Sequence, residues 1–300
     1  MTRPVWVLIL RLGVTLLALV LIARALGTEA IVVALRNTQP LWVGLAVGAL
    51  ASQIALSALR WQETARALGL AFPRGLALRE YWLAVLGNTV LPGGVLGDVG
   101  RAVRMQGQAG LAAAAETVVI ERLAGQLALG FVTCAGLALW LAPHPAAFAA
   151  SAGGIGLAGM IWLVLWQAGR MPGRAGRVGA RLRLAWWAER IWQRQLGLSA
   201  AILLSNLLGF WAAAHAVGIT LDLRAAVFLL PLTLMAMLVP LSINGWGLRE
   251  GAAAALWPIA GVAASDAVAA SLLFGIAALI AAVPGTFGLL YKSRAKVTAD

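Results

Sequence analysis

Long runs of apolar residues constrain this chain more than any other feature. A helix needs about 20 apolar residues to cross a bilayer, and charged residues make up only 11% of the sequence. A typical soluble domain carries about 25% and could not keep so many apolar runs in water. The sequence therefore predicts an all-α, polytopic integral membrane protein. Examples of such runs are Leu41–Leu59, Leu123–Leu141, Ile155–Trp166, Leu198–Val217 and Ala267–Leu290.

The apolar segments predict about six full spans within a single transmembrane domain over residues 1–300. We read the first as a retained span, because no small-x-small cleavage site follows it. The spans are expected near residues 6–26, 41–60, 120–141, 147–167, 198–217 and 267–290.

The positive charges predict the orientation of the chain. Its net charge is +12, and short basic loops remain in the cytoplasm. The densest basic stretch, 168–197, is predicted to be a cytoplasmic loop or, because tryptophans lie among its arginines, an interfacial helix. The basic tail at 292–296 is cytoplasmic by the same rule. We expect a bacterial-type cytoplasmic (inner) membrane, both termini in the cytoplasm and no nucleic-acid partner.

Two further regions, Leu76–Met105 and Ala225–Ile259, are apolar but interrupted by proline, glycine and charged residues. Proline removes a helical hydrogen bond and glycine weakens a helix. Broken backbone persists at membrane depth only where protein buries it or where it lines a wet cavity. Counting the spans makes the first region start and end inside and the second outside. We therefore predict two re-entrant helical hairpins that enter from opposite faces and meet near the midplane.

The order of these segments predicts an inverted repeat. Span, hairpin and span at 41–141 would correspond to span, hairpin and span at 198–290. Broken segments in corresponding positions of two halves point to the binding site of a transporter. The alternative is two ordinary kinked helices with different connectivity.

The first broken region contains a motif suited to an anion. Its glycines allow a tight turn, and freed backbone amides there can face a negative charge. Asp98 and Arg101 are three residues apart, so they share one face of a helix and can pair. The candidate binding residues in this motif are Asn88, Pro92, Gly93, Gly94, Gly97, Asp98 and Arg101.

A second motif and one charged dipeptide complete the candidate lipid-headgroup site. Arg249 and Glu250 are adjacent, so on a helix they point about 100° apart and each is expected to need another partner. Glu121 and Arg122 stand at the expected start of an apolar span. Ionisable residues within a membrane usually face the interior or a cavity. The alternative is a structural ion-pair network between the hairpins. The candidates here are Glu121, Arg122, Asn244, Gly245, Gly247, Arg249 and Glu250.

The sequence offers little for catalysis. It has one cysteine and two histidines, which gives poor support for metal chemistry or for a Cys/His or Ser/His arrangement. We expect no catalytic residues, no metal and no cofactor, and hence no enzyme.

Three blocks, LPGGVLGDVGRAVRM, VVIERLAG and PLSINGWGLREGA, resemble the signature blocks of the lysylphosphatidylglycerol synthase transmembrane-region family, also called flippase-like. The resemblance spans nearly the whole chain, with the blocks in the family's order. Many relatives carry Asp-Arg where this chain has Glu121-Arg122, which keeps the charge pattern. Aminoacyl-lipid synthases of the family add a large soluble domain, and the chain ends at Asp300. We therefore expect the membrane part only.

The resemblance implies lipid movement between leaflets, because better understood members move an aminoacylated lipid and others are linked to glycolipid, polyprenyl-lipid or hopanoid pathways. We expect a flippase-like translocase of a phospholipid, glycolipid or polyprenyl-type lipid. Its partners would be anionic or phosphate-bearing membrane lipids, with a homo-oligomer or a lipid-modifying enzyme as further partners. Two alternatives remain open: a lipid-linked transferase with Asp98 or Glu250 as base, and a non-transporting accessory subunit.

Overall fold

The computed structural model describes residues 28–91, 94–107, 110–142, 173–187, 191–239, 244–290 and 298–299, with scattered positions elsewhere. The spans predicted near 6–26 and 147–167 lie outside the described residues, apart from isolated positions. The helices are α2 (Thr28–Arg36), α3 (Pro40–Ala67), α4 (Arg74–Val90), α5 (Leu96–Arg104), α6 (Gly110–Leu141), α8 (Gly173–Trp187), α9 (Ile191–Ala216), α10 (Leu223–Met235), α11 (Leu248–Leu256), α12 (Ala264–Ala282) and α13 (Phe287–Leu290). Short 3-10 turns follow α10 as η1 (Ala236–Leu238), α11 as η2 (Trp257–Ala260) and α12 as η3 (Val283–Thr286).

Four of the described helices are long and apolar enough to cross a membrane: α3, α6, α9 and the continuous segment Ala264–Thr286. They coincide with the spans predicted near 41–60, 120–141, 198–217 and 267–290, which confirms an all-α membrane protein. α6 begins well before its predicted start, because the alanine-rich segment after Gly110 is a strong helix former. Glu121 and Arg122, which we expected at the start of this span, therefore lie well inside the helix.

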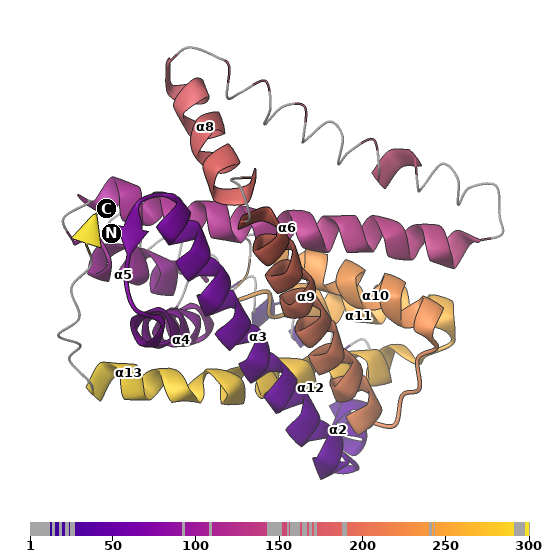
Figure 1. Ribbon diagram of the computed structural model, residues 1–300. Coiled ribbons are helices and arrows are strands. Elements are labelled where there is room, and N and C mark those ends of the chain that lie inside the picture. The colour runs from indigo at the N-terminus through magenta and orange to yellow at the C-terminus, as the bar shows by residue number, and fades with distance from the viewer. Residues whose placement is uncertain are drawn as a thin grey trace.

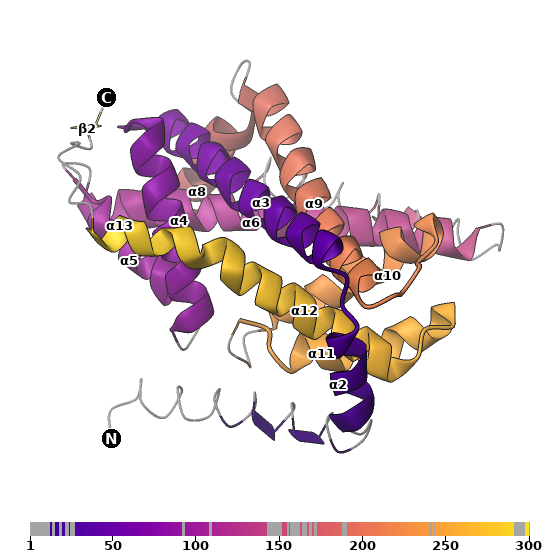
Figure 2. The same ribbon diagram turned by 90° about the horizontal axis from the view of Figure 1, so that it is seen from below.

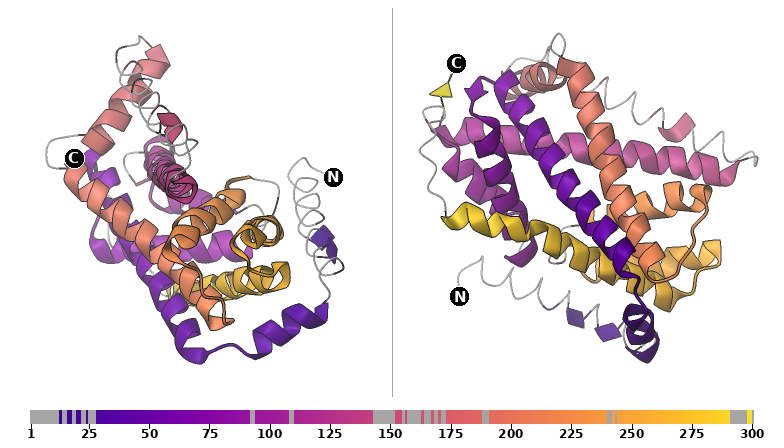
Figure 3. Two further views of the ribbon diagram at one scale, coloured as in Figure 1. Left: turned by 90° about the vertical axis from the view of Figure 1, so that its right-hand side faces the viewer. Right: turned by 60° about the horizontal axis from the view of Figure 1, so that its bottom comes forward.

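The long helices run antiparallel, α3 to α9 and α6 to α12, but only the first two pack against each other extensively. α3 and α9 pack against each other along their lengths and cross the molecule diagonally (Figure 1). α6 and α12 run in opposite directions on opposite sides of the molecule, both in Figure 1 and in the view from below (Figure 2). The shorter helices α4, α5, α10 and α11 fill the space between these long helices (Figure 3).

Each of the two broken regions folds as a pair of helices joined by a turn: α4 with α5, and α10 with α11. Pro231, which we counted among the breakers, instead lies buried inside α10, and that helix continues to Met235. Proline has no N–H to bond the carbonyl four residues earlier, which here belongs to Val227. Gly136 of α6 packs directly on that carbonyl, where a Cβ atom would clash. A close helix contact thus covers the place where the hydrogen bond is missing.

Each hairpin packs on the last long helix of the other half of the chain. α10 lies along α6, and α4 lies along the end of α12 and η3. Gly285 in η3 packs on the carbonyl of Trp82 in α4, where a Cβ atom would clash. The Trp82 indole donates a hydrogen bond to the carbonyl of Ala281 at 3.0 Å. These crossed contacts bring the tips of both hairpins to the middle of the molecule.

The chain end lies beside the turn that follows α3. Two-residue strands β1 (Leu70–Ala71) and β2 (Thr298–Ala299) pair antiparallel. The C-terminal residues are thereby on the same side as Arg66 and Arg74, which flank this turn in the sequence.

Candidate functional site

The two hairpin tips touch each other. A Cβ atom on Gly94 would lie 3.6 Å from the amide nitrogen of Asn244, although 149 positions separate the two residues in the sequence. Both have positive φ, +63° at Gly94 and +48° at Asn244, a region that glycine and asparagine tolerate best. The predicted approach of the two broken regions is confirmed at these residues. Pro92, Gly93 and Pro240 lie outside the described residues.

Asn88 shapes the first hairpin from its α4 side. Its side-chain oxygen accepts hydrogen bonds from the backbone amides of Gly97 at 2.9 Å and of Asp98 at 3.3 Å. Its side-chain nitrogen donates to the Asp98 carboxylate at 3.0 Å. Gly97 makes the close approach possible, because a Cβ atom there would clash with the carbonyl of Ala84. Asn88 therefore caps the start of α5 across the hairpin, as an N-cap residue does within one helix.

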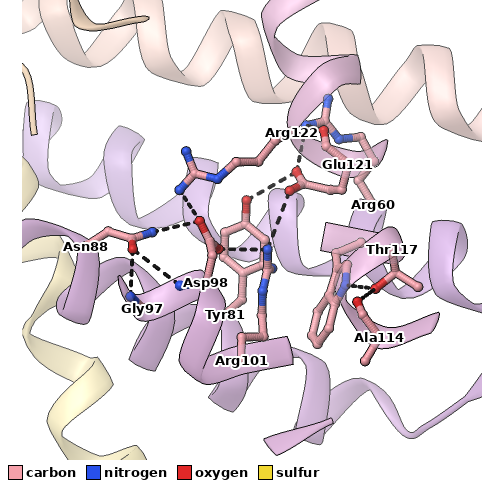
Figure 4. A network of polar contacts seen from close by, with 11 residues as sticks. Arg60, Tyr81, Asn88, Gly97, Asp98, Arg101, Ala114, Thr117, Glu121 and Arg122 are labelled. Atoms are coloured by element: carbon pink, nitrogen blue, oxygen red, sulfur yellow. Dashed lines mark hydrogen bonds and ion pairs between the residues drawn. The ribbon is translucent and has the colours of Figure 1, made fainter. Parts of the chain in front are cut away.

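Asp98, Arg101, Glu121 and Arg122, which the sequence singled out, form one network together with Arg60 (Figure 4). Arg101 pairs with Asp98 at 2.9 Å and lies 3.8 Å from Glu121. Arg60 pairs with Glu121 at 2.7 Å, and Arg122 forms an ion pair with Asp98. The network links α3, α5 and α6, and it holds three arginines against two carboxylates. It thus carries an excess of positive charge.

Arg101 is enclosed within this network. Its side chain is 1% exposed, and its guanidinium carbon lies 4.4 Å from the ring centroids of both Trp61 and Tyr81. Cations are attracted to aromatic faces, most strongly away from water. Tyr81 also donates a hydrogen bond to Glu121 at 3.2 Å. The aromatic rings and carboxylates therefore hold Arg101 in place from several sides.

The charges of the second motif are sealed inside the protein. Arg249 and Glu250 pair with each other at 2.6 Å, with side chains 1% and 0% exposed. The expectation that helical geometry keeps these two side chains apart was wrong, because the long arginine side chain folds back on its neighbour, whereas the further partners that we expected are present. Ser271 of α12 contacts both, at 2.9 Å from each, and the Gly247 amide donates to Glu250 at 2.6 Å. Both charges of this pair are therefore neutralised and hydrogen-bonded within the protein.

A cavity of about 300 Å³ lies between the hairpin tips and the long helices. Arg60, Glu121 and Arg122 provide its charges, and the Arg122 side chain is 42% exposed, so the cavity is accessible. Among the other described residues that line it are Gln53, Ser57, Tyr81, Asn88, Thr89, Gly94, Gln126, Leu129, Ser199, Leu203, Asn206, Leu238 and Asn244.

The cavity divides the residues that the sequence singled out into two groups. Asn88, Gly94, Glu121, Arg122 and Asn244 line it. The others that the structure describes do not line it but support the hairpins behind it; these are Gly97, Asp98, Arg101, Gly245, Gly247, Arg249 and Glu250.

Sequence reasoning missed several lining residues. Arg60 was not singled out from the sequence, although it is 3% exposed. The signal was present as helical spacing: Gln53, Ser57 and Arg60 recur at four and three residues, which places them on one face of an otherwise apolar helix. Ser199 and Asn206, seven residues apart, repeat the pattern on α9.

Several buried polar atoms at this site have no hydrogen-bond partner among the described residues. They include Nε of Arg60, Nε and Nη1 of Arg101, and Oδ1 of Asn206. Buried polar atoms are usually satisfied, so each of these atoms calls for a partner such as a water molecule, an ion or a ligand. No group of three or more His, Cys, Asp or Glu side chains suited to a metal occurs in the described part of the chain.

Comparison with known proteins agrees with the motifs. No curated protein matches the chain significantly. The family described as lysylphosphatidylglycerol synthase TM region matches residues 8–285, a range that includes all four long helices and both hairpins. The arrangement of helices and charges described above thus lies within the matched region. The chain belongs to the lysylphosphatidylglycerol synthase TM region family.

Proposed function

We propose that this protein is a lipid translocase of the cytoplasmic membrane, moving a phospholipid, glycolipid or polyprenyl-type lipid between leaflets. The headgroup would occupy the cavity between the hairpin tips while the apolar tails remain in the bilayer. The observation that carries the proposal is an accessible cavity with excess arginine among four helices apolar enough to span a membrane. Charge at membrane depth is costly, so a protein retains it there for a purpose.

Arg60 and Arg122 are the residues best placed to bind phosphate. Both line the cavity, and guanidinium groups match phosphate geometry. Arg101 and Arg249, which were also candidates for the headgroup site, are enclosed by their own partners. In this proposal Asp98 and Glu121 orient the two cavity arginines, and a bound phosphate neutralises the remaining positive charge.

The transferase alternative has less support. It needs a carboxylate free to act as a base, and it would assign that role to Asp98 or Glu250. Asp98 is bonded to Asn88, Arg101 and Arg122, and Glu250 is bonded to Arg249, Ser271 and the Gly247 amide. Both carboxylates are therefore occupied by partners within the protein, and neither is free to take a proton from a substrate.

The proposal includes an inverted repeat with both termini in the cytoplasm. The crossed contacts of Gly136 on α10 and of Gly285 on α4 support it, as do the opposite directions of α6 and α12 (Figure 2). Single cysteines in a Cys134→Ala background test the topology. Gln106→Cys, after α5, should react with a membrane-impermeant reagent only from the cytoplasmic side, and Ala263→Cys, before α12, only from outside. Reaction of both from the same side would refute the inverted arrangement.

Lipid movement itself is tested with protein reconstituted into vesicles that contain a fluorescent phospholipid, using an impermeant quencher to report the outer leaflet. Wild-type protein should expose inner-leaflet lipid to the quencher, and Arg60→Gln and Arg122→Gln should slow this strongly. Arg66→Gln is the matched control, since Arg66 lies on the same helix as Arg60 and is 55% exposed. Equal rates in wild-type and protein-free vesicles, for phospholipid and glycolipid probes alike, would contradict the proposal.

A further inference from the structure

The cavity has a second end that phosphate binding does not use. Three contacts fix one antiparallel register between α3 and α9: Gln195 with Thr64 at 3.0 Å, Ser199 with Arg60 at 3.1 Å, and Gly209 packed against Leu50. Continuing this register places Asn206 level with Gln53, and both residues line the cavity. Seven residues of helix separate these levels, a rise of about 10 Å.

The two ends differ in chemistry. The Arg60 end holds the ion pair of Arg60 with Glu121 at 2.7 Å, whereas the Gln53 end presents amides and hydroxyls from Gln53, Ser57 and Asn206. Gln53 donates to the Ser57 hydroxyl at 3.1 Å. The Asn206 side-chain oxygen is buried without a hydrogen-bond partner among the described residues. This end is therefore neutral and has an acceptor unused.

The positive charge around the cavity disfavours an ammonium group. Glu121 is the only carboxylate among its described lining residues. Its Oε1 accepts hydrogen bonds from Arg60 and Tyr81, whereas its Oε2 has no hydrogen-bond partner among the described residues and lies 3.8 Å from the Arg101 guanidinium. A cation bound at Glu121 would stand beside arginines and be repelled by them.

We propose that the cavity selects lipids whose phosphate carries an uncharged hydroxylated group, a polyol or sugar, over lipids whose phosphate carries an ammonium group. The phosphate pairs with Arg60 and Arg122. The hydroxyls reach toward Gln53, Ser57 and Asn206, donating to the unused oxygen of Asn206. A volume of about 300 Å³ equals roughly ten water molecules, which suits one headgroup without its tails. This selectivity rests on the proposed headgroup site and adds the substrate class to it.

The test measures binding of short-chain lipids to the purified full-length protein in detergent by native mass spectrometry. The probes are dioctanoyl phosphatidylinositol, phosphatidylglycerol, phosphatidylethanolamine and phosphatidic acid. We expect phosphatidylinositol and phosphatidylglycerol to bind about tenfold more tightly than phosphatidylethanolamine, the size expected from one or two hydrogen bonds. Phosphatidic acid, which has the phosphate but no hydroxylated group, should bind less tightly than phosphatidylinositol.

Variants at the neutral end separate selectivity from phosphate binding. Asn206→Leu should remove the preference for phosphatidylinositol and leave phosphatidic acid binding unchanged. Asn206→Asp adds a carboxylate where the ammonium would lie, so it should shift the preference toward phosphatidylethanolamine. Because Asn206→Asp is expected to bind phosphatidylethanolamine more tightly, it still tests the selectivity if Asn206→Leu fails to fold. Gln193→Leu, at an exposed position of the same helix, is the control.

The outcomes for the two proposals are distinct. Equal binding of phosphatidylinositol and phosphatidylethanolamine, still weakened by Arg60→Gln, would overturn the selectivity and leave the headgroup site standing. Binding of all four lipids that does not respond to Arg60→Gln or Arg122→Gln would overturn the headgroup site as well. Failure of Asn206→Asp to improve phosphatidylethanolamine binding in a folded protein would also count against the selectivity.

Discussion

The α4–α5 hairpin and the α10–α11 hairpin carry similar charges, an arginine near a carboxylate just beyond the tip, but these charges have different neighbours. Asp98 and Arg101 belong to a network that extends through Glu121 and Arg122 to an accessible cavity. Arg249 and Glu250 are closed off by Ser271 and the Gly247 amide. Under the proposed function, the first set of charges serves a ligand and the second serves the fold, and what differs between them is the surroundings of each set. Four experiments follow from this comparison.

The largest expected effect comes from joining the two tips. The Cβ position of Gly94 is 3.9 Å from the Cα atom of Asn244, close enough for a disulfide. In a Cys134→Ala background, Gly94→Cys with Asn244→Cys should cross-link and stop lipid movement, because the headgroup must pass between the tips. A reducing agent should restore it, and each single cysteine variant serves as a control. Undiminished movement in the cross-linked protein would show that the tips need not separate.

Breaking the sealed pair should cost the most stability. Arg249→Ala leaves Glu250 buried without its partner, a loss of about 3–5 kcal/mol. Thermal unfolding in detergent should show a sharply lower Tm. The double variant Arg249→Met with Glu250→Leu is the matched control and should be more stable than Arg249→Ala, because it leaves no unpaired charge. A normal Tm with lost lipid movement would instead place Arg249 in the headgroup path.

Arg122→Gln should have the opposite effect to Arg249→Ala: it should weaken lipid binding and leave Tm nearly unchanged. Its side chain is 42% exposed, so its pair with Asp98 contributes little to folding. A charge-assisted hydrogen bond to phosphate is worth about 1.5–3 kcal/mol, so lipid affinity should fall about 10- to 150-fold while Tm changes little. Both quantities are measured on the same detergent-purified sample. A large drop in Tm without a change in lipid binding would make this network structural too.

The smallest expected effect concerns the cap of the first hairpin. Asn88→Ala removes the side-chain oxygen that accepts from Gly97 and Asp98, and losing an N-cap costs about 0.5–2 kcal/mol. A modest fall in Tm should accompany it. Thr89→Ala is the control, since the Thr89 hydroxyl donates only to the nearby Leu86 carbonyl at 2.9 Å. An unchanged Tm in Asn88→Ala would mean that the tip is held by other contacts.

The local sequence predicted many residues of the candidate site, but it did not predict which of them contact one another. Helical spacing correctly paired Asp98 with Arg101. The same helical geometry wrongly predicted that Arg249 and Glu250 point apart, because a long flexible side chain is not limited to the direction of its Cα–Cβ bond. Arg60 was passed over, since its position at the end of an apolar run matched an ordinary basic loop. Only the packing of α3 on α6 and α9 shows that Glu121 and Ser199 enclose it.

By itself, the sequence determined the class of protein, the four long helices that the structure describes and the places where two further segments break. Those features depend on composition and on neighbouring residues, so they can be read along the chain. The tertiary structure decided which charges meet, because contacts such as Gly94 with Asn244 and Arg60 with Glu121 join segments far apart in the sequence. Charges cost too much at membrane depth to stay unpaired, but the sequence does not state which partner each one finds. Close packing at glycines such as Gly136 and Gly285 sets the positions of the helices. Those positions determine which charges become partners.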